Sequence, residues 1–315
     1  MGRRVKRECL PVTPRFRMVA GPNGSGKTTL MRRLAKDYAV NFYDVVNADD
    51  IFAEVSRTGA YAPGISIPDG LARSYAETTS YPDDVKALFR NGEITVESDM
   101  IRFHSQESVN SYSVALVAAF LQTMHILQGA SFSQETVFSH PSKVDALCEA
   151  RKKGFRTYLY FVATESELIN SARVASRAAL GGHSVPQEKV ASRFPLSIAN
   201  AAAALRFLSR AYFFDNSGET MRFFAEWSDE NGLVHVDGAE VPKWFSPVEA
   251  AAGEIYAGAG AMRPDAALAA SAAAASREAI AEAFSAGLSV TVVRNGRIVR
   301  ISPDGAETQV EETLA

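Results

Sequence analysis

The residues with the clearest chemical signature form a glycine-rich stretch near the amino terminus. It reads Gly21, Pro22, Asn23, Gly24, Ser25, Gly26, Lys27, Thr28 and Thr29 and fits the P-loop pattern G-x-x-x-x-G-K-[ST]. Its glycines let the backbone curl so that N–H groups face a phosphate. Lys27 would reach the β and γ phosphates of a bound ATP, and the Thr28 hydroxyl would ligate Mg²⁺. We expect the whole stretch to contact the nucleotide.

The elements on either side suit this chemistry. Residues 16–20 form a short apolar run that predicts a strand, and residues 30–35 predict a helix. A helix that starts at the loop adds positive potential where the phosphates would lie. The alternative is a glycine-rich turn without a ligand, which the flanking strand and helix disfavour.

Two aspartates follow the next predicted strand. Val45-Val46 predicts a short buried strand, and Asp49 and Asp50 come where it ends and a helix begins. In open α/β sheets, ligands bind at the carboxyl ends of the strands. We therefore assign Asp49 to the γ-phosphate region, as the group that takes the proton of an acceptor hydroxyl. The alternative for either aspartate is a helix N-cap, and we expect Asp50 to be that cap or a second substrate contact.

A third strand predicted over residues 130–138 places Glu135 and Thr136 near its carboxyl end. A buried, unpaired glutamate in a strand is costly. The position therefore favours a role in orienting substrate hydroxyls or a metal-bound water, and an ion pair with a neighbouring Lys or Arg is the alternative.

A basic helical element later in the chain predicts a lid. Arg177 lies on one predicted helix and Arg193 on the next, and Gly181-Gly182-His183 joins them. Cations brought in on closure would offset charge on a transferred phosphoryl group. The alternative is that these arginines are exposed helix charges. Arg173 is a weaker lid candidate, because side chains four residues apart on one helix often only pair locally.

Composition limits the possible partners. The chain has 315 residues and a formal net charge of −3, so its overall charge indicates neither nucleic acid nor a membrane surface as partner. The apolar run over residues 112–127 is too short to span a bilayer. The two cysteines, Cys9 and Cys148, have no metal-ligand spacing and fit a reducing compartment, which favours a cytoplasmic location.

These patterns predict an α/β fold. We expect a P-loop NTPase three-layer sandwich with a mostly parallel five-stranded sheet, an insertion and a small C-terminal helix–hairpin appendage. The predicted boundaries are a basic N-terminal arm over residues 1–12, a kinase-like domain over 13–247 with an insertion at 57–107, a linker over 248–263, and a helix plus β-hairpin module over 264–315.

The ordered combination of motifs resembles the zeta toxin family of P-loop kinases. The residues that carry the resemblance are Asn47-Ala48-Asp49, Glu135-Thr136, Arg177 with Gly181-Gly182-His183, and Asp215-Asn216-Ser217. The resemblance implies ATP-dependent phosphorylation of a small hydroxyl-bearing substrate. For several members of the family this is the 3′-hydroxyl of UDP-N-acetylglucosamine.

The resemblance also implies roles for single residues. Asp49 matches the family's base position, Glu135 and Thr136 match substrate contacts, and Arg177 and Arg193 are similar to the lid arginines. Lys27 and Thr28 match the phosphate and Mg²⁺ contacts. The insertion at 57–107 is a departure from the family at the place where substrate would be bound. The tail over 264–315 looks like short proteins found beside some zeta-like toxins, which implies inhibition in cis or by an antitoxin.

Two other functions fit part of the pattern. One is a P-loop ATPase that couples hydrolysis to motion, although the chain has no Leu-Ser-Gly-Gly-Gln stretch. The other is a nucleotide-binding regulatory protein whose tail binds a partner. A GTPase is disfavoured because the chain lacks an Asn-Lys-x-Asp motif.

Overall fold

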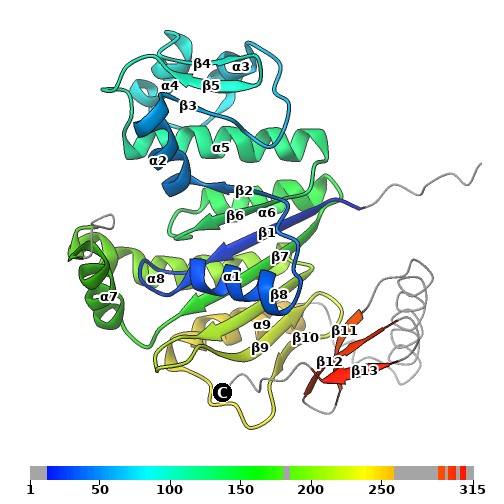
Figure 1. Ribbon diagram of the computed structural model, residues 1–315. Coiled ribbons are helices and arrows are strands. Elements are labelled where there is room, and N and C mark those ends of the chain that lie inside the picture. Colours follow the sequence, from blue (N-terminus) through cyan, green and yellow to red (C-terminus); the bar gives the residue numbers. More distant parts are fainter. Residues whose placement is uncertain (1–12, 180–184, 259–289, 295–296, 303–305, 310–315) are drawn as a thin grey trace, which may run out of the picture.

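A seven-stranded sheet forms the centre of the molecule (Figure 1). The structure is a computed structural model that describes residues 13–179, 185–258, 290–294, 297–302 and 306–309. The strand order is β10-β9-β8-β7-β1-β6-β2. Five of these strands run parallel: β1 (Arg15–Ala20), β2 (Asp44–Asn47), β6 (Phe132–Thr136), β7 (Arg156–Ala163) and β8 (Arg210–Asp215). The last two, β9 (Arg222–Ser228) and β10 (Gly232–His235), are antiparallel.

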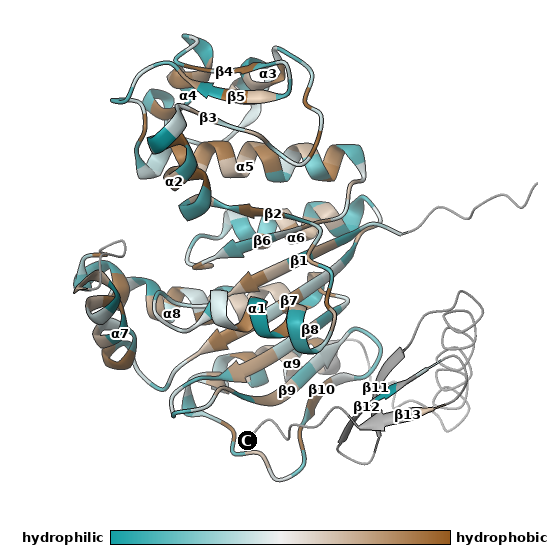
Figure 2. Ribbon diagram, in the orientation of Figure 1, coloured by the Kyte–Doolittle hydropathy of each residue, from teal (hydrophilic) through white to brown (hydrophobic). Residues whose placement is uncertain are grey.

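Helices cover both faces of the sheet, because alternate strand residues point to opposite sides. Phe16 and Met18 of β1 belong to the larger core, whereas Val19 belongs to a second core. In that second core Leu30 and Leu34 of helix α1 (Lys27–Asp37) pack on Val19 and on β7. Several other helices contribute buried residues to the larger core, among them α5 (Ser111–Gln128), α6 (Ser142–Lys152), α8 (Gln187–Ala204) and α9 (Ser246–Gly258). Figure 2 shows the hydrophobic residues along the central strands and α5.

The segment between β2 and β6 carries a small subdomain of its own. Its elements are α2 (Ala48–Thr58), β3 (Ala60–Tyr61), α3 (Leu71–Thr78), α4 (Asp83–Arg90), β4 (Ile94–Glu97) and β5 (Met100–Phe103). The three short strands form an antiparallel sheet in the order β3-β5-β4. The subdomain packs on α5, where the rings of Phe89 and Phe120 meet with centroids 5.5 Å apart. The sequence predicted an insertion at 57–107, and β3, α3, α4, β4 and β5 all lie within that range.

The predicted mostly parallel sheet is present, but it has seven strands rather than five, because the β9–β10 hairpin extends it. β9 pairs with β8, and Trp227 of β9 is buried against the larger core. The hairpin therefore completes the sheet edge. Aromatic residues seal this end of the core: Phe213, Phe224, Trp244 and Phe245.

The boundary predicted for a linker at 248–263 is wrong at its amino-terminal end. Residues 248–258 belong to helix α9, and Val248 and Ala252 are buried in the larger core. Alanine-rich composition reads as a spacer in sequence, but here its small side chains let the helix pack closely on α8 and β10. Residues 259–263 lie outside the described residues.

Part of the predicted C-terminal module is described. Strands β11 (Val290–Arg294), β12 (Arg297–Ile301) and β13 (Glu307–Gln309) form an antiparallel sheet, so the predicted hairpin is confirmed and gains a third strand. The predicted helix over 267–284 lies outside the described residues. Among the described helices, none has the length and hydropathy needed to cross a membrane.

The burial of α9 makes a testable prediction. Val248→Ala removes two methyl groups from a closed core and should lower the free energy of unfolding by about 2 kcal/mol in urea titrations. Val241→Ala is the matched control, since Val241 is 37% exposed and should change stability little. Equal effects of the two substitutions would mean that residues 248–258 do not pack as described.

Candidate active site

The P-loop lies between β1 and α1 and is closed in by two asparagines from distant segments. A Cβ on Gly24 would lie 2.5 Å from the carbonyl oxygen of Asn170, and one on Gly26 would lie 2.6 Å from Nδ2 of Asn216. Both glycines also have positive φ, of 79° and 100°. Glycine is therefore required at both positions, for backbone conformation and for space.

Lys27 begins α1 and folds back over the loop. Its Nζ donates a hydrogen bond to the carbonyl oxygen of Pro22 at 3.1 Å. Burial lowers the pKa of Lys27 to about 8, the nearby Arg177 lowers it too, and Glu135 and Asp49 act in the opposite direction. The three side chains that perturb this lysine are ones that the sequence assigned to the site, so the fold brings all three within electrostatic reach of Lys27.

Glu135 lies beside the predicted magnesium ligand. β1 and β6 pair in parallel with Val19 opposite Glu135. This register places the Glu135 carboxylate at the start of α1, where the Thr28 hydroxyl donates to its Oε1 at 2.9 Å. Its other oxygen is buried without a hydrogen-bond partner. Burial raises the pKa of Glu135, whereas Lys27 and Thr28 oppose this. Glu135 thus lies beside the P-loop, at the start of α1.

The N-cap of α2 is Asn47. Its side chain accepts a hydrogen bond from the backbone N–H of Asp49 at 3.0 Å. The N-cap alternative is therefore wrong for both Asp49 and Asp50, and the substrate contact predicted for Asp50 stays a prediction. Both aspartates lie in the first turn of α2 with exposed side chains. Asp49 influences the pKa of Lys27 and Glu135, and Asp50 that of Glu135.

The predicted lid residues differ in their surroundings. Arg177 lies in the last turn of α7 (Glu167–Ala179), is exposed, and acts on Lys27. Arg193 lies on α8, and its side chain has no hydrogen bond or ion pair with the described residues. The joint at Gly181-Gly182-His183 falls outside the described part of the chain. The lid role of both arginines therefore stays a prediction.

Arg173 has a role that the sequence did not predict. Its Nη1 donates to the carbonyl oxygen of Asn216 at 2.8 Å, and its Nη2 lies 3.4 Å from that of Gly218. Asn216 in turn donates from Nδ2 to the carbonyl oxygen of Ser25 at 2.8 Å. Helix α7 is thus tied to the loop after β8, and that loop is tied to the P-loop.

The loop after β8 is held in place by hydrogen bonds to the buried carboxylate of Asp215. Asp215 is 2% exposed and accepts hydrogen bonds from Ser217, Arg222 and Trp244. The sequence named Asp215-Asn216-Ser217 only among the residues that carry the family resemblance and did not identify Asn216 as a support of the P-loop. A short side-chain amide after a strand carries no periodic signal, so spacing alone could not have found it.

Thr136 shapes the turn that follows β6. Its Oγ1 accepts from the backbone N–H of Phe138, which has a φ of 64°. Helix α8 holds the same turn, because Ser197 and Asn200 donate to the carbonyl oxygens of Val137 and Phe138. The substrate contact predicted for Thr136 stays a prediction.

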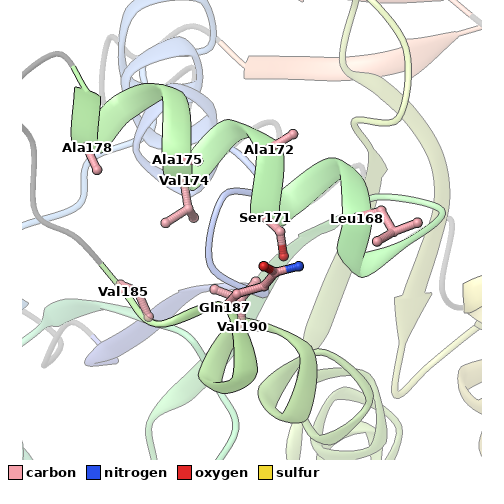
Figure 3. Close-up of a pocket in the computed structure, with 9 residues that line it drawn as sticks. All are labelled: Leu168, Ser171, Ala172, Val174, Ala175, Ala178, Val185, Gln187 and Val190. Atoms are coloured by element: carbon pink, nitrogen blue, oxygen red, sulfur yellow. The ribbon is translucent and has the colours of Figure 1, made fainter.

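A cavity of about 390 Å³ lies between α7 and α8, next to the active site rather than in it (Figure 3). Its wall is mostly apolar and offers no cation to a phosphate. The residues that line it are Leu168, Ser171, Ala172, Val174, Ala175, Ala178, Val185, Gln187 and Val190.

The donor set at Thr28 fits Mg²⁺ bound together with a nucleotide. A hydroxyl and a carboxylate oxygen with an open lone pair are hard oxygen ligands, and Mg²⁺ commonly takes few protein ligands with phosphates and water completing its shell. Among the described residues, no group of three or more His, Cys, Asp and Glu side chains could hold a metal without such help.

Comparison with known proteins gives distant structural neighbours. No protein-family model matches the chain, and no curated protein matches it significantly. Among solved structures, the PezAT chromosomal toxin–antitoxin system of Streptococcus pneumoniae has 13% identity and a TM-score of 0.40, over 75% of this chain and 77% of that one. The AvrRxo1-ORF1:-ORF2 complex with ATP has 18% identity and a TM-score of 0.40, over 69% of this chain and 59% of that one.

A third neighbour is a proposed kinase from Chloroflexus aurantiacus, with 17% identity and a TM-score of 0.33 over 58% of this chain and 77% of that one. TM-scores of this size do not establish a common fold. The fold is therefore assigned from the strand order of the sheet and from the loop between β1 and α1. The fold is that of a P-loop NTPase.

The hydrogen bond from Asn216 to the P-loop predicts an effect on nucleotide binding. Asn216→Ala removes the donor to Ser25 and should weaken ATP binding roughly 3- to 10-fold in calorimetric titrations. Asn231→Ala, the same substitution in an exposed turn, should leave affinity unchanged. Equal affinities of the two variants would show that the P-loop does not need this support.

The lowered pKa of Lys27 predicts a pH dependence. The amine is charged below about pH 8 and neutral above it, so phosphate binding requires proton uptake at high pH. The dissociation constant for ATP should rise about tenfold between pH 7 and pH 9. A Lys27→Arg variant, which keeps its charge over this range, should show a nearly flat profile. A flat profile for the unaltered protein would contradict the lowered pKa.

Proposed function

We propose that this protein is a P-loop kinase that transfers the γ-phosphate of ATP to a hydroxyl of a small molecule, with a sugar nucleotide such as UDP-N-acetylglucosamine as the first candidate acceptor. The observation that carries the proposal is that Glu135, Asp49 and Arg177, from three different elements, all lie close enough to Lys27 to act on its pKa.

The proposed transfer follows from the positions of the side chains. The P-loop N–H groups and Lys27 bind the β and γ phosphates of ATP. Asp49 orients the acceptor hydroxyl and takes its proton while the hydroxyl oxygen forms a bond to the γ-phosphorus. The bond from that phosphorus to the bridging oxygen of ADP breaks, and ADP leaves. Arg177 and Arg193 close over the transferred group and offset its charge.

Thr28 and Glu135 are the residues that would hold the metal, Thr28 directly and Glu135 through water. When bound there, Mg²⁺ would neutralise charge on the β and γ phosphates. Glu135 is suited to this role because a bound cation would lower its raised pKa again. The carboxyl group would then be ionised and could bind the metal as an anion. The exposed first turn of α2 leaves room for an acceptor beside Asp49.

The identity of the acceptor can be tested directly. The full chain is incubated with γ-labelled ATP and a panel of UDP-sugars, nucleotides, NAD and other hydroxyl-bearing metabolites, and products are identified by mass spectrometry. The proposal expects label on one acceptor and ATP turnover that depends on it. ATP turnover that is equally fast without any acceptor would favour the ATPase instead.

Asp49 and its neighbour provide a matched test of the base. Asp49→Asn should lower the transfer rate by about 10²- to 10⁴-fold, because the amide cannot take the proton. Asp50→Asn makes the same change one position along the helix and should cost less than tenfold. Circular dichroism checks that both variants fold. Comparable rates for Asp49→Asn and the unaltered protein would remove Asp49 as the base.

A further inference from the structure

The face of the sheet that carries α1 has a basic and aromatic cluster at the amino-terminal ends of its strands. Parallel pairing sets Arg15 beside Arg156 and Arg17 beside Tyr158. The side chains of α1 pack further along the strands, on Val19 and Tyr160. Successive β1 residues rise about 3.3 Å each, so Arg15 lies roughly 17 Å from the P-loop end of the strand. The cluster is therefore separate from the proposed active site.

Arg17 is the buried member of this cluster. Only 8% of it is exposed, yet its Nε and Nη1 have no hydrogen-bond partner in the structure. Its guanidinium carbon lies over the rings of Tyr43 and Tyr158, at 5.2 and 5.1 Å from their centroids. The rings stabilise the positive charge, and the hydroxyls of Tyr43 and Tyr160 lie close enough to interact with the guanidinium, but no acceptor reaches Nε or Nη1.

Arg15, two residues earlier on the same face, is half-buried and similarly placed. Its Nη1 donates to the hydroxyl of Tyr43 at 3.2 Å, and its Nε is buried without a partner. Neither Arg15 nor Arg17 forms an ion pair with a carboxylate in the described residues. By contrast Arg210, on the same face, pairs with Glu226 at 3.2 Å. Buried cations are normally paired, because removing them from water is costly.

We propose that Arg15, Arg17 and the Tyr43 hydroxyl form a second anion site, separate from the P-loop, that binds a phosphate group. Two guanidinium groups without counter-charges, with Arg156 beside them, favour a doubly charged oxyanion over a single carboxylate. Arginine N–H groups match the oxygens of phosphate well. The partly exposed rings of Tyr43 and Tyr158 would flank the ligand at the surface. Burial alone would raise the pKa of Tyr43, but the hydrogen bonds and charges of Arg15 and Arg17 outweigh it and lower that pKa, which fits a positive local field.

Equilibrium dialysis with ³²P-labelled inorganic phosphate tests the site, because it measures how much phosphate the protein binds and how tightly. The Lys27→Ala background weakens the P-loop, so the remaining binding reports on the cluster. In that background Arg15→Ala should weaken phosphate binding about tenfold or more, since it removes charge-assisted hydrogen bonds. Arg210→Ala is the matched control on the same face and should leave phosphate binding unchanged, because Arg210 already has a carboxylate partner.

The source of the phosphate group is distinguished by competition. Displacement by inorganic pyrophosphate but not by a short single-stranded oligonucleotide indicates a small phosphate ligand, and stronger displacement by the oligonucleotide indicates a nucleic-acid backbone. Either result supports the site if Arg15→Ala abolishes the phosphate binding that the competitor displaces. If Arg15→Ala unfolds the protein, Arg15→Gln replaces it. Phosphate binding that is identical with and without Arg15, or absent in the Lys27→Ala background, would overturn the proposal.

Discussion

The parallel pairing of β1 with β6 is the constraint on which the candidate site depends. β1 delivers the chain into the P-loop, and β6 lies directly beside it, so the ends of the two strands meet at one edge. The register puts Glu135 opposite Val19, and the first residues of α1 then bring Thr28 onto that carboxylate. A shift by one residue would turn Glu135 to the other face of the sheet. The chemistry of the edge is thus fixed by hydrogen bonds between two buried strands.

A second set of contacts holds the P-loop in shape from the opposite side. Asn216 links the loop after β8 to the P-loop by a hydrogen bond to the Ser25 carbonyl, and Arg173 connects the same loop to α7. Helix α7 also bears Arg177. A displacement of this helix would therefore move both Arg177 and the loop that supports the P-loop. The structure therefore provides a physical path by which the position of the predicted lid helix and the shape of the phosphate cradle can influence each other.

The sequence predicted the parallel core and the P-loop because both have strong local signals. A glycine pattern between an apolar strand and a helix, or a run such as residues 156–163, needs no distant partner to be recognised. Long-range features were less accessible. Asn47 was missed as the cap of α2 because two aspartates nearby are equally good caps by type. Asn216 and Arg173 act through backbone carbonyls, which leave no trace in side-chain patterns, and α9 was mistaken for a linker because its alanines look alike whether packed or exposed.

The polar groups around Lys27 show why this edge is suited to binding rather than to stability. Burial lowers the pKa of Lys27 even though its Nζ donates to the Pro22 carbonyl, and Glu135 keeps one buried oxygen without a partner. Each arrangement is costly in a folded protein, because buried polar groups normally find good partners. A triphosphate with its cation would relieve both at once, by giving the amine an anionic acceptor and the carboxylate a positive neighbour. Strain of this kind is expected where a fold has kept polar groups poised for a charged ligand, and it is concentrated where β1 and β6 end.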